Sequence, residues 1–191
     1  MWKSIKQLTN AITQRRQRRE ALEFQNHDVQ VEHDNYLVCR AVVPDIPEMI
    51  TLEQAIFHGH APWSAAQLER ELNDRQHYMY LAFRHNDRLV AFAGCRFDLA
   101  NGTADITRIA VLPQYLHRGV GERLIRGLTQ EAQQHGCQQI KLAVKETNTD
   151  EQHRYARVGF GKRRTVKNYY KLTDHEAEDA VEMQYDKGDQ S

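Results

Sequence analysis

Apolar side chains recur at helical spacing in the segment that follows residue 119. The recurring residues are Val120, Leu124, Leu128 and Ala132, with Ile125 beside them. Residues 120–134 are therefore predicted to form an amphipathic helix with one buried stripe. His135-Gly136 provides its C-terminal stop. Residues 109–111 read as the end of a buried strand, and a short basic loop joins that strand to the helix.

The rest of the chain alternates between strand-like and helix-like patterns. Strands are predicted over 36–43, 78–83, 89–97, 104–111, 139–145, 160–170 and 180–185, and further helices over about 45–57, 64–72 and 149–158. Asn86-Asp87 and Asn101-Gly102 are hairpin turn signals. The order βααβββαβαββ predicts an α+β fold, with a mixed, mostly antiparallel central sheet of about seven strands and helices on both faces.

Both ends of the chain depart from this pattern. Residues 1–22 combine helical apolar spacing with many Lys and Arg residues, and residues 23–35 are polar. We therefore expect a basic terminal helix and linker over 1–34, one domain over 35–186 and a tail over 187–191. A basic amphipathic helix suits an anionic surface, such as a ribosome or a membrane. A weakly docked terminal helix is the other interpretation.

Composition narrows the class of protein. The 191 residues suffice for one domain with a modest extension. Lys+Arg and Asp+Glu both number 26, so no net charge favours nucleic acid, and no specific nucleic-acid binding is expected. The three cysteines are scattered, no metal-ligand spacing occurs, and the apolar runs are short. We expect a cytoplasmic protein with reduced thiols and no bound metal.

The loop before the long helix has the chemistry of an anion site. It reads His117-Arg-Gly-Val-Gly-Glu122. A helix N-terminus presents unpaired N–H groups and a positive dipole end, which suits a phosphate or pyrophosphate. Gly119 and Gly121 allow close approach to the main chain. A P-loop would need Gly-Lys-Ser/Thr, and a dinucleotide fold a third glycine where Leu124 stands. A tight turn without a ligand is the other interpretation.

Three local motifs resemble the GNAT superfamily of N-acetyltransferases. The first is Ile109-Ala-Val111 followed by residues 117–122, and the second is Asn148 with Tyr155-Ala-Arg-Val-Gly-Phe160. The third, Pro62-Trp63-Ser64 with Asn168-Tyr169-Tyr170, is similar to the branch that acetylates the N-terminal alanine of ribosomal proteins (RimI-type). The resemblance covers about residues 35–185 and leaves the basic extension outside.

This resemblance implies roles for particular residues. Acetyl-CoA would be the acetyl donor, held by Ile109, Ala110, Val111, His117, Arg118, Gly119, Val120, Gly121, Glu122 and Asn148. Tyr155 would be the general acid that protonates the leaving thiolate. Trp63, Tyr169 and Tyr170 would line the acceptor groove. The residues alone describe Asn148 equally well as a helix N-cap, and Tyr155 as a core aromatic.

The chain departs from the family pattern at the general base. The family has Glu where Ala143 stands, and Gln or Arg where Leu116 stands. Asp105 is a candidate substitute base, and Glu146 and His153 are further alternatives. A base can also be dispensable, because an α-amino group of pKa about 7.7–8.0 is roughly one tenth neutral at pH 7. A lysine amine, with a pKa of about 10.4, is almost entirely charged there.

These features predict an acetyl-CoA-dependent N-acetyltransferase that acts on the N-terminal α-amine of a protein. The resemblance implies a ribosomal protein that begins with alanine. Two alternatives stay open on the sequence. One is a GNAT enzyme for a small-molecule amine or a lysine. The other is a catalytically weak coenzyme-A-binding module, tethered to a ribosome or membrane by residues 1–22.

Overall fold

The computed structural model describes residues 21–57, 59, 63–171 and 177–186. These residues form one eight-stranded sheet in the order β1-β2-β3-β4-β5-β6-β8-β7. β5 and β6 run parallel, and the other neighbouring pairs are antiparallel. The predicted α+β fold is therefore confirmed. The predicted basic helix lies almost entirely outside the described residues.

The elements follow the predicted order closely. They are β1 (His27–Val31), β2 (Asp34–Arg40), η1 (Val43–Asp45), α2 (Ile46–Ile56), α3 (Ala65–Asn73), β3 (Tyr78–His85), β4 (Arg88–Asp98), β5 (Thr103–Val111), η2 (Pro113–Tyr115), α4 (Val120–Gln134), β6 (Gln139–Lys145), α5 (Thr149–Arg157), β7 (Phe160–Lys171) and β8 (Ala177–Tyr185).

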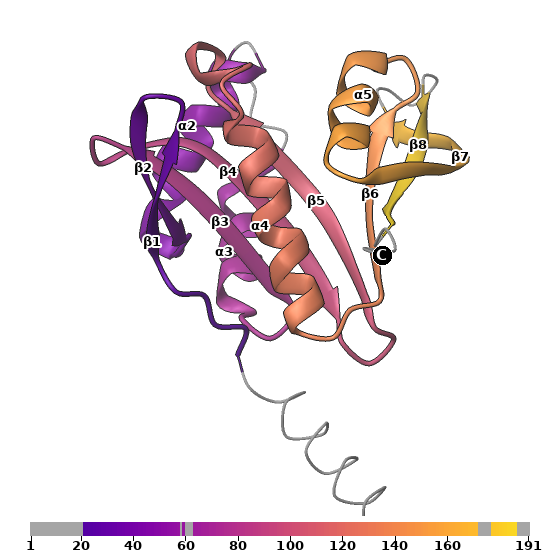
Figure 1. Cartoon of the computed structure of the whole chain (residues 1–191), viewed down its shortest axis with the longest axis horizontal. Coiled ribbons are helices and arrows are strands. Elements are labelled where there is room, and N and C mark those ends of the chain that lie inside the picture. Colours follow the sequence, from indigo (N-terminus) through magenta and orange to yellow (C-terminus); the bar gives the residue numbers. More distant parts are fainter. Residues whose placement is uncertain (1–20, 58, 60–62, 172–176, 187–191) are drawn as a thin grey trace, which may run out of the picture.

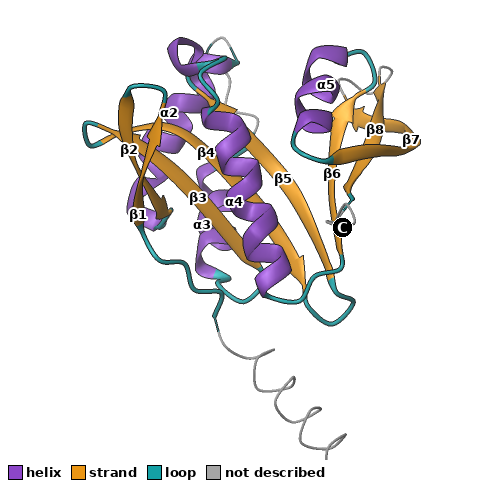
Figure 2. Cartoon of the chain, viewed as in Figure 1, coloured by secondary structure: helices purple, strands orange, loops and turns teal. Residues whose placement is uncertain are grey.

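Helices cover both faces of the sheet, as Figures 1 and 2 show. α4 lies across β3, β4 and β5, where its stripe residues Leu124 and Leu128 are fully buried. α2 and α3 cover the opposite face and form a second core cluster that includes Met49 and Leu68. α5 packs on the α4 side, because Tyr155 belongs to the α4 cluster. The pleat of the strands thus divides the core between two helical layers.

The segment predicted to be a polar linker, residues 23–35, contains strand β1. β1 pairs with β2 from His27↔Val38 to Val31↔Asp34, and Val31 is buried. The prediction was wrong because only alternate residues of this edge strand face the core, so five residues carry too little apolar signal. The folded domain therefore begins before residue 35 and has eight strands rather than about seven.

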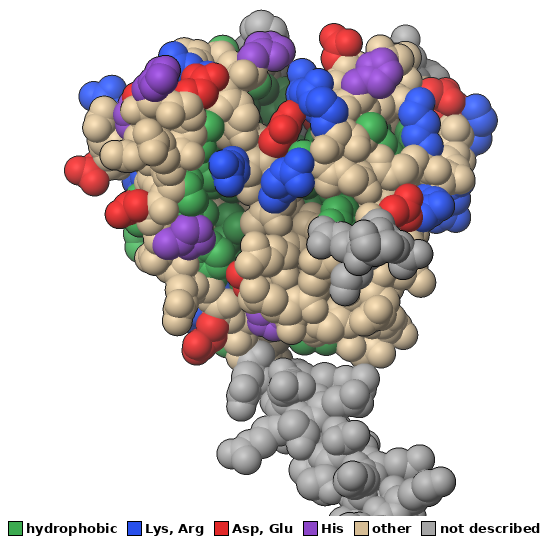
Figure 3. Space-filling model, in the orientation of Figure 1, with side chains coloured by type: hydrophobic (Ala, Val, Ile, Leu, Met, Phe, Trp, Pro, Cys, Tyr) green, Lys and Arg blue, Asp and Glu red, His purple; other side chains and the backbone are tan. Residues whose placement is uncertain are grey.

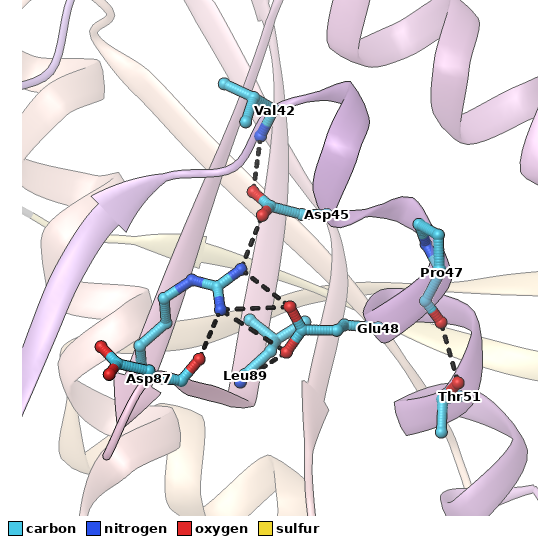
Figure 4. Close-up of polar contacts among 8 residues, drawn as sticks. Val42, Asp45, Pro47, Glu48, Thr51, Asp87 and Leu89 are labelled. Atoms are coloured by element: carbon cyan, nitrogen blue, oxygen red, sulfur yellow. Dashed lines mark hydrogen bonds and ion pairs between the residues drawn. The ribbon is translucent and has the colours of Figure 1, made fainter.

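Arg84 fixes the start of α2 to the β3–β4 turn through contacts with Asp45, Glu48 and Asp87, which are labelled in Figure 4. Its guanidinium lies 2.6 Å from Asp45 Oδ1 and 3.2 Å from Glu48 Oε1, and it donates to the Asp87 carbonyl at 2.9 Å. Glu48 also accepts the Leu89 N–H at 3.0 Å. That backbone hydrogen bond, helped by Arg84, holds the pKa of Glu48 below its ordinary value. The network sets the position of α2, which forms one wall of the cavity described below.

Replacing Glu48 with Gln is expected to lower the free energy of unfolding at pH 7 by at most about 1 kcal/mol, because the Glu48 side chain is 47% exposed. The folded-state pKa lies below the unfolded one. The contribution of the carboxylate is therefore present above the unfolded pKa and is lost as the pH falls through the folded pKa. Urea unfolding at neutral pH and at about pH 3 measures it. A difference from wild type that does not shrink in acid would contradict this account.

β5 and β6 pair over only part of their length. The pairing runs from Thr103↔Gln139 to Ile106↔Leu142. β5 then continues to Val111 and β6 to Lys145, and Figure 1 shows the two strands diverging towards α5. The backbone of residues 109–111 is paired with β4 on one side and has an open edge on the other.

Candidate active site

Two cavities flank the place where β5 and β6 separate. The larger, about 700 Å³, is bounded by α2, α3, β5, β6 and β7, and we call it the α2-side cavity. The smaller, about 380 Å³, lies between the end of β5, the loop before α4 and helix α5, and we call it the loop-side cavity. Ile109, Glu151 and Tyr155 line both. The two cavities therefore meet at these three residues.

The loop before α4 leaves the N-terminus of that helix uncapped beside the loop-side cavity. Gly119 is the N-cap of α4 with φ of +81°, and His117 also has a positive φ, of +63°. No side chain caps the helix, and its first hydrogen bond is Arg123 N–H to the Gly119 carbonyl, 3.0 Å long. The preceding N–H groups are therefore free to meet an anion at the positive end of the helix.

The residues predicted to bind the coenzyme lie in four kinds of place. Six line the loop-side cavity: Ile109, Val111, His117, Gly119, Gly121 and Glu122. Ala110 lines the α2-side cavity, whereas Val120 is fully buried in the core. Asn148 and Arg118 line neither cavity. Asn148 caps α5 by accepting the Glu151 N–H at 3.2 Å.

The β1–β2 hairpin holds Arg118 beside the loop. Asp34 Oδ2 lies 3.2 Å from the Arg118 guanidinium, which also lies 5.4 Å from the centroid of the Tyr115 ring. His85 Nδ1 is in turn 3.0 Å from the Tyr115 hydroxyl. Figure 3 shows Lys and Arg side chains, with an acidic side chain between them, on the face that α4 covers. They lie near the place where β5 and β6 diverge in Figure 1. Arg154 and Arg157 line this cavity together with the acid Glu122, and Arg118 lies beside its loop, so an anion there would have cationic side chains within reach.

Tyr155 stands where the cavities meet and is 5% exposed. Its hydroxyl donates to Glu151 Oε1 at 2.5 Å, and Asn148 Nδ2 donates to Glu151 Oε2 at 2.8 Å. Burial, and then the charge and hydrogen bond of Glu151, raise the pKa of Tyr155 well above its ordinary value. The site therefore holds a protonated phenol in contact with a carboxylate.

A buried ionic network forms another wall of the α2-side cavity. Arg108 Nη2 donates to Glu71 Oε1 at 3.3 Å, and the guanidinium lies 4.5 Å from the Trp63 ring centroid. Glu71 also accepts the hydroxyl of Tyr80. Glu53 is 2% exposed, and burial raises its pKa against the opposing effects of Arg108 and the Trp63 N–H. The network packs beneath Trp63 and supports its ring.

A β-bulge turns Arg108 into this network. Gly94 pairs with Arg108 and Cys95 pairs with Ile106, so Thr107 is the extra residue of β5. The bulge reverses the faces along β5, because Ile106 belongs to the α4 cluster and Ala110 to the α2 cluster. Sequence reasoning missed Arg108, Glu53 and Glu71 because no local spacing connects them. Glu151 had a local signal, its position four residues before Tyr155 on the same helix.

The residues predicted for the acceptor side lie together. Trp63, Tyr169 and Tyr170 all line the α2-side cavity, whereas Pro62 lies outside the described residues. Tyr170 donates its hydroxyl to the Ala143 carbonyl at 3.1 Å. Asp105 lines the same cavity and is paired with Arg96 at 2.7 Å.

The two further base candidates lie outside both cavities. Glu146 accepts the Thr165 hydroxyl at 3.3 Å, and His153 is exposed on α5. In the described part of the chain, no group of three or more His, Cys, Asp or Glu side chains could hold a metal ion. No helix in that part is long and apolar enough to cross a membrane.

The chain is similar in sequence to known proteins. Residues 46–160 match the acetyltransferase (GNAT) family. The [ribosomal protein bS18]-alanine N-acetyltransferase of Haemophilus ducreyi is 32% identical over 143 residues, which cover 74% of this chain and 94% of that protein. Its Escherichia coli K12 counterpart is 31% identical over 140 residues, covering 73% of this chain and 89% of that protein.

Solved structures give the same result for the fold. The crystal structure of the Escherichia coli ribosomal-protein-S18-alanine N-acetyltransferase superposes with a TM-score of 0.67 at 28% identity, covering 78% of this chain and 92% of that one. The PaiA N-acetyltransferase of Thermoplasma acidophilum, solved with coenzyme A, superposes with a TM-score of 0.61 at 16% identity, covering 78% and 99%. The latter similarity is one of fold.

Proposed function

Since the chain belongs to the GNAT family and is an acetyl-CoA-dependent N-acetyltransferase, we propose an acceptor for it. The proposed acceptor is the N-terminal α-amine of a protein. The meeting of the two cavities at Tyr155 carries the proposal. An amine entering from one side can there reach an acyl group entering from the other. The relatives named bS18-alanine N-acetyltransferases support a ribosomal protein with N-terminal alanine as the acceptor.

The loop-side cavity fits the donor substrate. The uncapped N–H groups of α4, with His117, suit its pyrophosphate. The open edge of residues 109–111 suits the amides of its extended arm, like an added strand. When bound, acetyl-CoA supplies the acetyl group as a thioester. Arg118, paired with Asp34, lies beside the same loop as a further donor for a phosphate oxygen.

The α2-side cavity fits the acceptor. It has room for more than a small amine, and the aromatic residues Trp63, Tyr169 and Tyr170 line it. Phe57 and Tyr169 remain 44% and 53% exposed, so they offer contact area to an extended peptide. The protonated Tyr155 then serves as the acid for the departing thiolate sulfur.

The acceptor is tested with three amines at equal concentration. An Ala-initiated peptide should be acetylated at its α-amine at pH 7, with kcat/KM at least tenfold above that of an N-blocked lysine peptide or a polyamine. The physical reason is the pKa difference between α-amines and lysine amines. Mass spectrometry of the products locates the acetyl group. Turnover of the polyamine alone would contradict the proposal, and turnover of none would favour the weak coenzyme-binding module.

Residues 1–22 are proposed to guide the enzyme to the ribosome through their positive charge. Ribosomal RNA presents a dense anionic surface, so binding should weaken as salt screens the charges. Co-sedimentation of the full chain with ribosomes at rising salt measures this. Retention that does not depend on salt, or sedimentation with anionic vesicles only, would contradict ribosome guidance.

A further inference from the structure

The site lacks a carboxylate at Ala143 on β6 but has one at Glu151 on α5. Ala143 lies on β6, where its carbonyl accepts the Tyr170 hydroxyl. Glu151 lies in the first turn of α5 and, with Ile109 and Tyr155, is shared by the two cavities. An amine and a thioester can meet only where both cavities are accessible. Glu151 is therefore the carboxylate placed at that meeting point.

We propose that Glu151 is the general base of this enzyme and that it works as one proton relay with Tyr155. The proposal rests on the N-acetyltransferase function described above. Asp105 is less well placed, because it lines only the α2-side cavity and is bound to Arg96 at 2.7 Å. Glu151 has no cation as partner among the described residues, and its two oxygens accept from Asn148 and Tyr155.

The relay balances the reaction. The lone pair of the neutral amine forms the new C–N bond, while the C–S pair leaves with sulfur. One proton passes from nitrogen to Glu151, and Glu151 passes a proton to the Tyr155 oxygen along their 2.5 Å contact. The Tyr155 hydroxyl proton passes to sulfur. Nitrogen loses one proton, sulfur gains one, and both side chains return to their starting states.

The contact between Glu151 and Tyr155 also determines when Tyr155 can donate its proton. The negative charge of Glu151 and its hydrogen bond both raise the pKa of Tyr155. Protonation of Glu151 by the incoming amine removes both effects, so Tyr155 becomes a better donor only after the amine has begun to lose its proton. Arg154 on the same helix acts in the lowering direction throughout. The charge of Glu151 also contributes to raising the pKa of Tyr170 on β7.

Glu151→Gln separates this role from capping of α5. Glu151 is the third residue after the N-cap Asn148, a position where Gln supports a helix as Glu does. The exchange therefore removes the basic group and keeps the shape and the cap. Asp150→Asn is the matched control, because Asp150 is an exposed acid in the same turn that lines neither cavity.

The expected result is a fall in kcat of about 10²-fold for Glu151→Gln and at most about twofold for Asp150→Asn. The affinity for coenzyme A, measured by calorimetry, and the melting temperature should match wild type. Adding Ala143→Glu to Glu151→Gln should recover about tenfold in kcat, because it supplies a carboxylate from β6 to the same cavity. The double variant Glu151→Gln/Tyr155→Phe should have a kcat no lower than that of the slower single variant. Either exchange alone already interrupts the relay, so the two losses should not add.

Several outcomes overturn the relay. Wild-type turnover in Glu151→Gln does so, as does a loss of coenzyme affinity and melting temperature that Ala143→Glu does not repair. A loss confined to Asp105→Asn would move the base to Asp105. A wrong acceptor gives a different result: the wild type acetylates another amine instead of the Ala-initiated peptide. The variants are then compared with wild type on that amine. Absence of turnover with every amine overturns both.

Discussion

Tyr155→Phe is expected to lower kcat by about 10²-fold or more, with little change in the affinity for coenzyme A. The hydroxyl is the only atom lost, and it stands where the two cavities meet. The ring packs against Phe160, with centroids 6.5 Å apart, and a phenylalanine keeps that contact. The chemical step should therefore lose its acid, while the fold and the coenzyme cavity stay intact. Steady-state kinetics and calorimetry with coenzyme A separate the two effects.

Tyr185→Phe is the matched control for the loss of a phenol. Tyr185 also packs on Phe160, at 5.6 Å between centroids, but it lines neither cavity. Its kcat should stay near that of wild type. Equal kcat values for Tyr155→Phe and wild type would remove Tyr155 from the acid role. A loss shared by both variants would point to disturbed packing around Phe160.

The elements around the loop-side cavity were predictable because their sequence signals are local. The apolar stripe of α4, the loop glycines and the strand before them are contiguous, and each has its own rule of geometry. β6 and the two hairpin turns were placed for the same reason. In the structure, six of the ten residues predicted for the coenzyme line one cavity.

The rest depended on contacts between distant segments. The strand formed by residues 27–31 is stable through its pairing with β2 and its burial on the core, and its short polar sequence carries little of that information. Arg108 enters the wall of the α2-side cavity through a bulge whose extra residue, Thr107, has no recognisable local signal. Glu151 lies one turn before Tyr155 on α5, but its place between the two cavities depends on how the distant segments pack.

Arg108→Met is expected to lower the free energy of unfolding by about 3 kcal/mol, towards the low end for a broken buried ion pair. The exchange keeps an unbranched side chain but leaves Glu71 without its cation, in a site where the two side chains are 3% and 14% exposed. Glu71 keeps the hydroxyl of Tyr80 as a donor, which limits the loss. Urea unfolding measures it. The KM for the acceptor peptide should also rise, because Arg108 supports the Trp63 ring.

Arg96→Met is the exposed counterpart. It breaks the pair with Asp105, in which the Arg96 side chain is 55% exposed, and should cost at most about 1 kcal/mol. Equal losses for the two arginine variants would show that burial does not distinguish the pairs.

Glu71→Gln, added to Arg108→Met, separates charge from packing. If the cost of Arg108→Met comes from an unpaired buried charge, neutralising Glu71 should recover most of the lost stability, and the double-mutant cycle should show coupling of 1 kcal/mol or more, on the order found for contacting charged groups. If the cost comes from lost packing under Trp63, the second exchange should recover nothing. The first result would mean that the acceptor wall depends on its charge balance, so substitutions at Arg108 are tolerated only together with changes at Glu71.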